Sequence, residues 1–104
     1  MITTTNISTT NNTTVYTSEG ESGITTLLIC NHHASTDAVV DVFVVPNLST
    51  AGNANQILKS LTIVASDTFV MDMEKLVLSD GDTVVIKSDV ADVVNSVISS
   101  MAVA

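Results

Sequence analysis

The residues best suited to bind a metal are the run Cys30-Asn31-His32-His33, because thiolate and imidazole groups are common ligands. A zinc site requires three or four such ligands in a tetrahedral arrangement. Adjacent side chains of a strand point to opposite faces, so His32 and His33 are poorly placed to bind one ion together. Cys30 and His32 could share a face, but no second cluster completes the site. We expect a core-facing Cys30, a histidine pair in a loop, and no metal or other cofactor.

The segment Asp80-Gly81-Asp82 has two of the oxygen ligands that a calcium loop would use. An EF-hand loop needs acidic or amide side chains at several fixed positions and a closing glutamate, which are missing here. The segment is therefore predicted to be a tight turn, with Gly81 available for a positive φ. Serine and threonine abound, but neither histidine lies in a catalytic motif, and there is no glycine-rich phosphate loop. We expect no enzymatic activity.

The charge of the chain limits its partners. It has three lysines, no arginine and eleven acidic residues, for a formal net charge of -8. Nucleic-acid binding requires basic residues that neutralise phosphates, and anionic membrane surfaces repel an acidic chain. We therefore expect neither nucleic acid nor a membrane as partner. The acidity is interpreted as a means of keeping a valine-rich chain soluble, and a basic partner surface stays open as an alternative.

Cysteine content and the first residues suggest a compartment. Cys30 is the single cysteine, so no disulfide is expected within the chain. The start, residues 1–5, has neither the positive nor the apolar region of a signal peptide. No apolar run reaches the length of a membrane helix. These features predict a protein that is made and kept in a cytoplasm.

The composition favours an all-β fold. The 104 residues correspond to one domain, and the hydrophobic fraction of 45% is mostly valine, isoleucine, leucine and alanine. Threonine and serine supply most of the polar residues. Residues branched at Cβ are stiff and suit a pleated sheet better than a helix.

Short β-prone segments separated by turns follow one another along the chain. The clearest is residues 38–44, where Ala38, Val40 and Val42 alternate with outward-facing residues until Pro46 ends the strand. The last segment, 90–101, also fits helical spacing, but valine and serine are indifferent helix formers. Together they predict a single antiparallel β-sandwich or jelly roll of about seven or eight short strands. The expected strands are residues 13–17, 24–31, 38–44, 57–63, 69–73, 75–78, 83–88 and 94–103.

The first residues differ from the rest. Residues 1–14 are almost entirely threonine, asparagine and serine, with Ile2 and Ile7 as the only apolar anchors besides the initial methionine. Such a segment is too polar to hold itself in place by burial. We interpret residues 1–12 as a polar N-terminal arm, either flexible or an edge strand ordered by a neighbour, and residues 13–104 as the β-sandwich domain.

Some strands are apolar on both faces. Val39 and Phe43 lie opposite the core-facing residues of their strand, and Val85 lies opposite Val84 and Ile86. Either the sandwich covers both faces itself, or the second face packs against another subunit. We favour self-association, and predict an interface that includes Val39, Phe43, Ile2 and Ile7.

Several segments in the second half of the chain are similar to a known group of proteins. Residues 58–63, 65–69 and 76–86 (LKSLTI, ASDTF and LVLSDGDTVVI) resemble small virion structural proteins of tailed bacteriophages, notably of cyanophages and other marine phages. Residues 14–17 and 29–31 agree with this resemblance, so that it spans roughly residues 13–103. The sequence departs from the pattern at Ala65-Ser66-Asp67, where a glycine is usual, and at His32-His33, where small residues are usual.

The resemblance implies a β-sandwich that binds other virion proteins and brings no catalytic motif. Within that class we expect a capsid decoration (cement) protein that binds the major capsid protein or another virion protein. We expect it to be a homotrimer, assembled in the bacterial host cytoplasm and located in the virion. The alternatives are a neck, tail or fibre component of the virion and a host-surface adhesion module. An adhesin would present loops with aromatic residues or a metal site. A cement protein would present an assembly surface and an arm, and the long polar N-terminus favours the cement protein.

Overall fold

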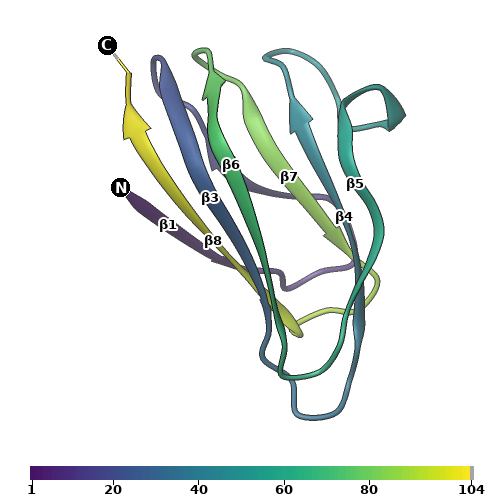
Figure 1. The fold of residues 1–104 in the computed structure, drawn as a ribbon. Helices are drawn as coiled ribbons and strands as arrows, with labels where there is room; N and C mark the ends of the chain where they lie inside the picture. The colour runs from purple at the N-terminus through teal and green to yellow at the C-terminus, as the bar shows by residue number, and fades with distance from the viewer. Residues whose placement is uncertain (104) are drawn as a thin grey trace.

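Two four-stranded antiparallel sheets pack face to face as a sandwich (Figure 1). The structure is a computed structural model that describes residues 1–103, except for the side chains of residues 73–75; Ala104, the last residue of the expected domain, lies outside the described residues. The expected all-β sandwich is thus confirmed. Its strands are β1 (Ile2–Asn6), β2 (Thr13–Thr17), β3 (Ser22–Asn31), β4 (Ala38–Val45), β5 (Gln56–Ile63), β6 (Thr68–Leu78), β7 (Thr83–Ser88) and β8 (Val94–Ala102), with a short 3-10 helix, η1 (Asn53–Asn55), before β5.

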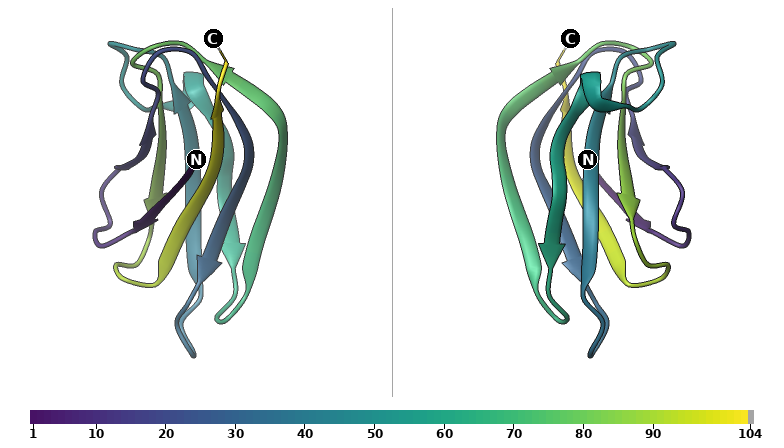
Figure 2. Two further views of the ribbon diagram at one scale, coloured as in Figure 1. Left: turned by 90° about the vertical axis from the view of Figure 1, so that its left-hand side faces the viewer. Right: turned by 90° about the vertical axis from the view of Figure 1, so that its right-hand side faces the viewer.

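The chain pairs as one long hairpin that is rolled up. β1 pairs with β8, β2 with β7, β3 with β6 and β4 with β5, all antiparallel. Two further ladders, β3–β8 and β4–β7, join these pairs into sheets of order β1-β8-β3-β6 and β2-β7-β4-β5. This is the strand order of a jelly roll, one of the two alternatives that the sequence leaves open. In Figure 2 the first sheet lies in front in the left view and the second in the right view.

The alternation of residues sets the inner face of β4 and fails on its neighbour β5. Ala38, Val40 and Val42 are fully buried in the core, as the period of two predicts. On β5 the backbone of Ser60 has a φ of 54°, and its N–H donates to the Asp41 carboxylate at 2.7 Å. This irregularity shifts the register. Leu58 therefore packs on the core and Ile57 is exposed, whereas a strict alternation counted back from Ile63 would turn Ile57 and Lys59 inward.

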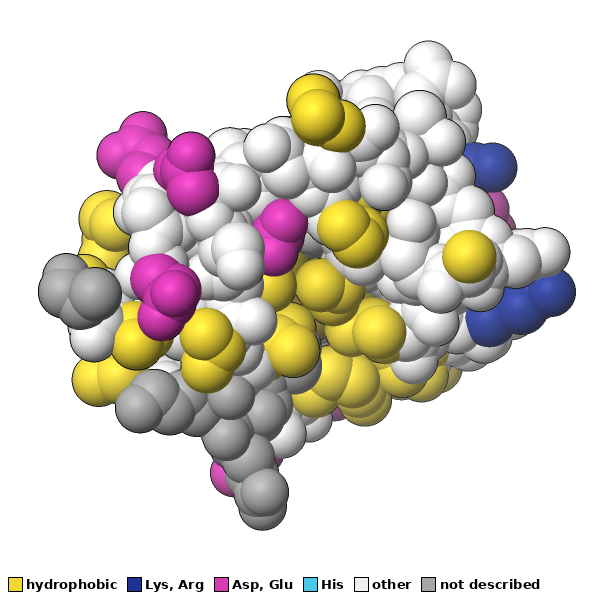
Figure 3. All heavy atoms as spheres, turned by 90° about the horizontal axis from the view of Figure 1, so that it is seen from above, with side chains coloured by type: hydrophobic (Ala, Val, Ile, Leu, Met, Phe, Trp, Pro, Cys, Tyr) yellow, Lys and Arg dark blue, Asp and Glu magenta, His cyan; other side chains and the backbone are white. Residues whose placement is uncertain are grey.

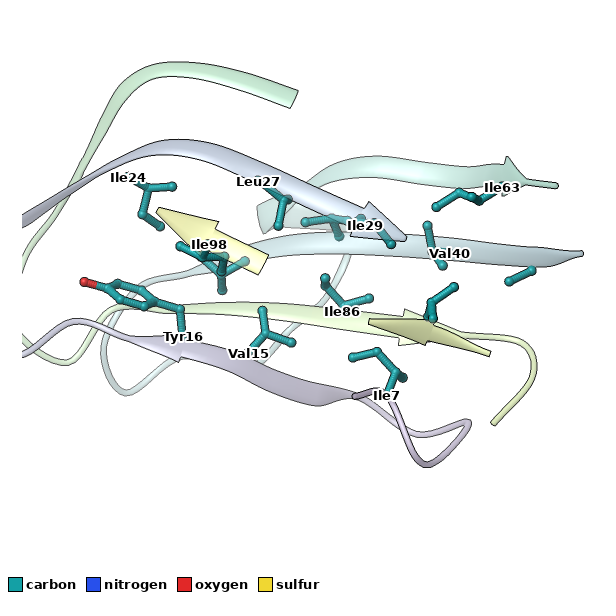
Figure 4. Close-up of a cluster of buried hydrophobic side chains, with 14 of the residues drawn as sticks. Ile7, Val15, Tyr16, Ile24, Leu27, Ile29, Val40, Ile63, Ile86 and Ile98 are labelled. Carbon is teal, nitrogen blue, oxygen red and sulfur yellow. The ribbon is translucent and has the colours of Figure 1, made fainter. Parts of the chain in front are cut away.

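The core lies between the inner faces of the two sheets (Figure 4). Ile24, Leu27 and Ile29 of β3 are almost fully buried against residues of β4 and β7. At one end of this layer Tyr16 is buried as well, and its hydroxyl donates to Ser22 Oγ at 2.8 Å. Burial of large aliphatic side chains contributes roughly 1.5–3 kcal/mol each, so this layer is the main source of stability.

The N-terminal segment is part of the sandwich, so its interpretation as an arm outside the domain is wrong. β1 forms an edge strand on β8, with Ile2 opposite Ser99 and Asn6 opposite Asn95. Beyond β1, Ile7 is 0% exposed, and its backbone bonds to Val94 and Asp92. Threonine is a good strand former, and one isoleucine inserted into the core fixes the segment.

This correction predicts a large difference between two isoleucines of the same segment. Ile7→Ala should lower the free energy of unfolding by about 2–4 kcal/mol, because it leaves a cavity in the core. Ile2→Ala should change it by less than about 0.5 kcal/mol, because Ile2 is 70% exposed. Urea denaturation followed by circular dichroism measures both values. Equal small effects would restore the interpretation of residues 1–12 as an arm.

Candidate functional site

Many acidic side chains hold the turns at the two ends of the sandwich. Asp82 is the clearest case, since its two carboxylate oxygens accept from the N–H groups of Asn47 (2.8 Å) and Ser79 (2.9 Å). The Gly81 φ of 85° confirms the turn predicted there. These carboxylates therefore have a structural use beyond solubility. Others that accept a backbone N–H are Asp37 from Ala65, Asp41 from Ser60, Asp67 from Thr68, Asp80 from Gly20 and Asp89 from Val39.

The residues of the run Cys30-Asn31-His32-His33 are divided between the outer face of a sheet, the core and a loop. Asn31 is fully buried, and its side-chain amide donates to the carbonyl oxygens of Thr36 (2.8 Å) and Ile63 (2.9 Å). His33 Nδ1 accepts from the N–H groups of two loop residues, and His32 lies beside Asn6. Cys30 lies on the outer face of β3, so its predicted core-facing position is wrong. Across the described residues, no three His, Cys, Asp or Glu side chains come together.

A hollow of about 460 Å³ lies at the end of the sandwich near both chain termini. Tyr16, Ser22 and Ser100 are among its lining residues, and Glu19 is its charged lining side chain. The Ser22 hydroxyl is engaged by Tyr16 Oη and lies 2.7 Å from Ser18 Oγ. The polar groups at its base are therefore satisfied within the chain.

The predicted interface is largely covered by the chain itself. Ile7 is in the core, and Phe43 is only 7% exposed because it packs with Val45, Val85 and Ala51 of the loop before β5. The prediction that Ile7 and Phe43 await another subunit is thus corrected: a core position and a loop of the same chain bury them. Val39 is half-buried, and Ile2 alone of the four is widely exposed.

The other sheet leaves its outer face bare. Across β1, β8, β3 and β6, Thr4, Val97, Leu28 and Val70 lie opposite one another in one row. Val70 is 61% exposed. We call the outward residues of these four strands the outer sheet face. Its further apolar residues are Ile2, Met101, Val77 and Cys30.

The two outer faces differ in charge. On the β2-β7-β4-β5 sheet, Asp41 and Lys87 lie opposite each other in the β4–β7 ladder. On β1, β8, β3 and β6, Asp72 is the one charged residue whose side chain the structure describes. Among the side chains that the structure describes, this face therefore combines several apolar residues with a single charged one, Asp72, which lies opposite Thr26. Contiguous exposed apolar surface typically marks a protein contact.

β6 connects this face with a second apolar surface. Val70 and Val77 face outward, whereas Phe69, Met71 and Leu76 pack on the core and stay half-exposed, because β6 is an edge strand. β5, the edge of the other sheet, contributes half-exposed core residues in the same way. Figure 3 shows a band of hydrophobic side chains on the side that faces the viewer in Figure 1, where both edges lie. β6 therefore has apolar residues on both of its faces.

Leu48 is an exposed apolar residue in an unfavourable backbone conformation. It is 98% exposed, and its φ is 68°, in the left-handed region that glycine favours. The turn around it is closed by a hydrogen bond from Ser49 N to Pro46 O at 3.0 Å. Both the exposure and the backbone conformation cost free energy, and strained residues of this kind cluster at functional sites.

The sequence held weak signals for these features. Leu48 is an isolated apolar residue in a polar loop directly after Pro46. The strands of the outer sheet face together contain few charged residues, but their membership in one sheet depends on pairing between distant parts of the chain.

Comparison with known proteins adds nothing further: no protein-family model matches the chain, and no curated protein or solved structure is significantly similar to it. None of the described segments is a helix long and apolar enough to span a membrane.

The role of the aspartates can be tested at one turn. Asp82→Ala should lower the free energy of unfolding by about 1–3 kcal/mol, because two backbone N–H groups lose a charged acceptor. Glu21→Ala, which removes the same charge from a neighbouring turn, should change it by less than about 0.5 kcal/mol. Thermal unfolding of both variants at one pH compares them. A similar loss in both would mean that net charge, and not the hydrogen bonds, sets the effect.

Proposed function

We propose that the protein is a virion structural protein of a tailed bacteriophage, a capsid decoration (cement) protein that works through protein–protein contacts. The outer sheet face is the observation that carries the proposal. A stable domain that keeps Val70, Val77 and Ile2 in water has a surface suited to another protein. The resemblance of residues 58–86 to small phage virion proteins is the reason for proposing that the partner belongs to a virion.

The chemistry of the surface favours protein over other partners. A nucleic-acid or anionic membrane partner would need a basic patch. The lysines whose side chains are described, Lys59 and Lys87, lie on the opposite sheet from the outer sheet face. A face whose described side chains are mostly β-branched, aliphatic or small and polar, with Asp72 as the one charged group, instead suits close packing against another protein surface.

Two alternatives are separated by different observations. A host-surface adhesion module would present aromatic residues in exposed loops, whereas Tyr16, Phe43 and Phe69 all lie on strands. This distribution favours an assembly protein. A neck, tail or fibre component would use the same contact chemistry, so the location in the virion decides between it and a decoration protein.

The direct test is binding to phage heads that lack the protein. The purified chain should co-sediment with such heads to a saturating amount, because decoration proteins occupy a fixed number of lattice positions. Val70→Asp should weaken the binding, since it places a carboxylate on the outer sheet face. Thr62→Asp adds the same charge at an exposed position on β5 of the other sheet, and should bind like the parent chain. Absence of binding to heads, together with binding to isolated tails, would assign the protein to the tail.

Leu48 provides a second test of contact, because stability and binding should change in opposite directions. Leu48→Gly should raise the free energy of unfolding by about 0.5–1 kcal/mol, since glycine adopts a positive φ without strain. The same change should weaken binding to heads by removing an apolar contact residue. Ser66→Gly relieves a similar φ of 66° in another turn and should leave binding unchanged. A Leu48→Gly protein that is more stable and binds equally well would exclude Leu48 from the contact.

A further inference from the structure

We infer that the outer sheet face takes a second copy of this chain, packed face to face across a two-fold axis. This inference rests on the proposed function: a second copy covers the outer sheet face in solution, and a phage head would take its place, because the dimer is reversible. The contact is centred on the row of Val97, Leu28 and Val70, with Ile2 and Val77 toward one end. It replaces the three-fold contact expected from the resemblance with a two-fold one.

The first argument is charge. Two copies that each carry a net charge of -8 repel each other unless the surfaces that meet carry little of that charge. Most acidic residues lie in turns and loops, such as Asp37, Asp67, Asp80 and Asp92, whereas Asp72 is the one described on the outer sheet face. Packing through the outer sheet face keeps the acidic groups of the turns and loops at the ends of the dimer, away from its centre. The outer face of the opposite sheet is less available, because Ala51 of the same chain already covers its apolar residues Phe43, Val45 and Val85.

The second argument is shape. Sheet faces pack on one another about 10 Å apart, with an angle of about 30° that follows from their twist. Short side chains such as Val70, Val97 and Ser99 give the outer sheet face a low relief that can meet its own copy. A two-fold axis brings identical patches together and closes the assembly at two copies.

The third argument is area. Four strands spaced about 4.8 Å apart, each contributing about eight residues at 3.3 Å, present roughly 500 Å² per copy. Two copies would bury about 1,000 Å² in total, which is close to the lower limit for a specific interface. The predicted dimer is therefore reversible, and its dissociation should be observable by dilution.

Strand addition at the edge of β6 is the less suitable mode of pairing. The ladder between β3 and β6 is irregular between Ile24 and Thr26, where one β3 residue lies opposite the segment between Asp72 and Leu76. Such irregularities interrupt the straight row of backbone groups that a new strand would need. The face of the sheet, and not its edge, is thus the contact.

Sedimentation equilibrium of the full chain over a wide concentration range tests the inference. The mass should rise from 10.9 kDa to twice that value and no further. Val70→Asp should raise the dissociation constant by about a hundredfold or more, because two carboxylates would be buried without partners. Thr62→Asp should leave the constant unchanged. A chain that stays monomeric, forms a trimer, or dimerises equally well with Val70→Asp would overturn the inference.

Cys30 gives an independent readout, because it is the single cysteine and lies half-buried on the outer sheet face. Its alkylation by iodoacetamide should slow as the dimer forms, and should stay fast in the Val70→Asp protein at the same concentration. An alkylation rate that does not change with concentration would place the contact elsewhere. A monomeric chain whose binding to heads still depends on Val70 would overturn the dimer and leave the proposed function standing. A chain that forms the dimer but does not bind heads would support the dimer and contradict the proposed function.

Discussion

Packing of the two inner sheet faces against each other is the interaction on which the rest of the structure depends. The buried layer combines residues from nearly the whole chain, from Ile7 to Ile98, and the nested strand pairing brings them together. Because the first strand pairs with the last, neither sheet can form from one half of the chain. The turns are then fixed by hydrogen bonds from backbone N–H groups to aspartates such as Asp82 and Asp80. The acidity of the chain is in this way tied to the geometry of its turns.

Once the inner faces are buried, the outer faces are free to differ, and they do. One is closed by the loop before β5, which covers Phe43, and carries opposite charges in its ladder. The other keeps an apolar row in water and has almost no charge among its described side chains. A difference of this kind within one small domain is what an assembly protein needs, because it restricts contacts to a defined side.

The sequence predicted strands where burial follows local periodicity and failed where burial depends on distant residues. The bounds of β2 and β7 match the prediction, because short runs of valine and threonine end at clear turns. β1 was placed outside the domain because its order comes from β8, more than eighty residues away in the same chain. Phe43 was assigned to an interface because nothing in the small-residue loop after Pro46 indicates that it folds back over β4. The bulge at Ser60, which turns Ile57 outward, could not be predicted for a similar reason. The hydrogen bond that stabilises it is accepted by Asp41, which lies on another strand.

The central claim is that a partner covers the outer sheet face and leaves the opposite face in water. Paramagnetic relaxation of methyl resonances by a soluble gadolinium chelate measures this directly on the assembled protein. The account predicts that the methyl groups of Val70 and Val97 relax much more slowly than their exposure in the single chain would give. The methyl group of Thr62 should relax at the rate that its exposure in the single chain gives. Rapid relaxation of Val70 at concentrations where the protein is assembled would contradict it.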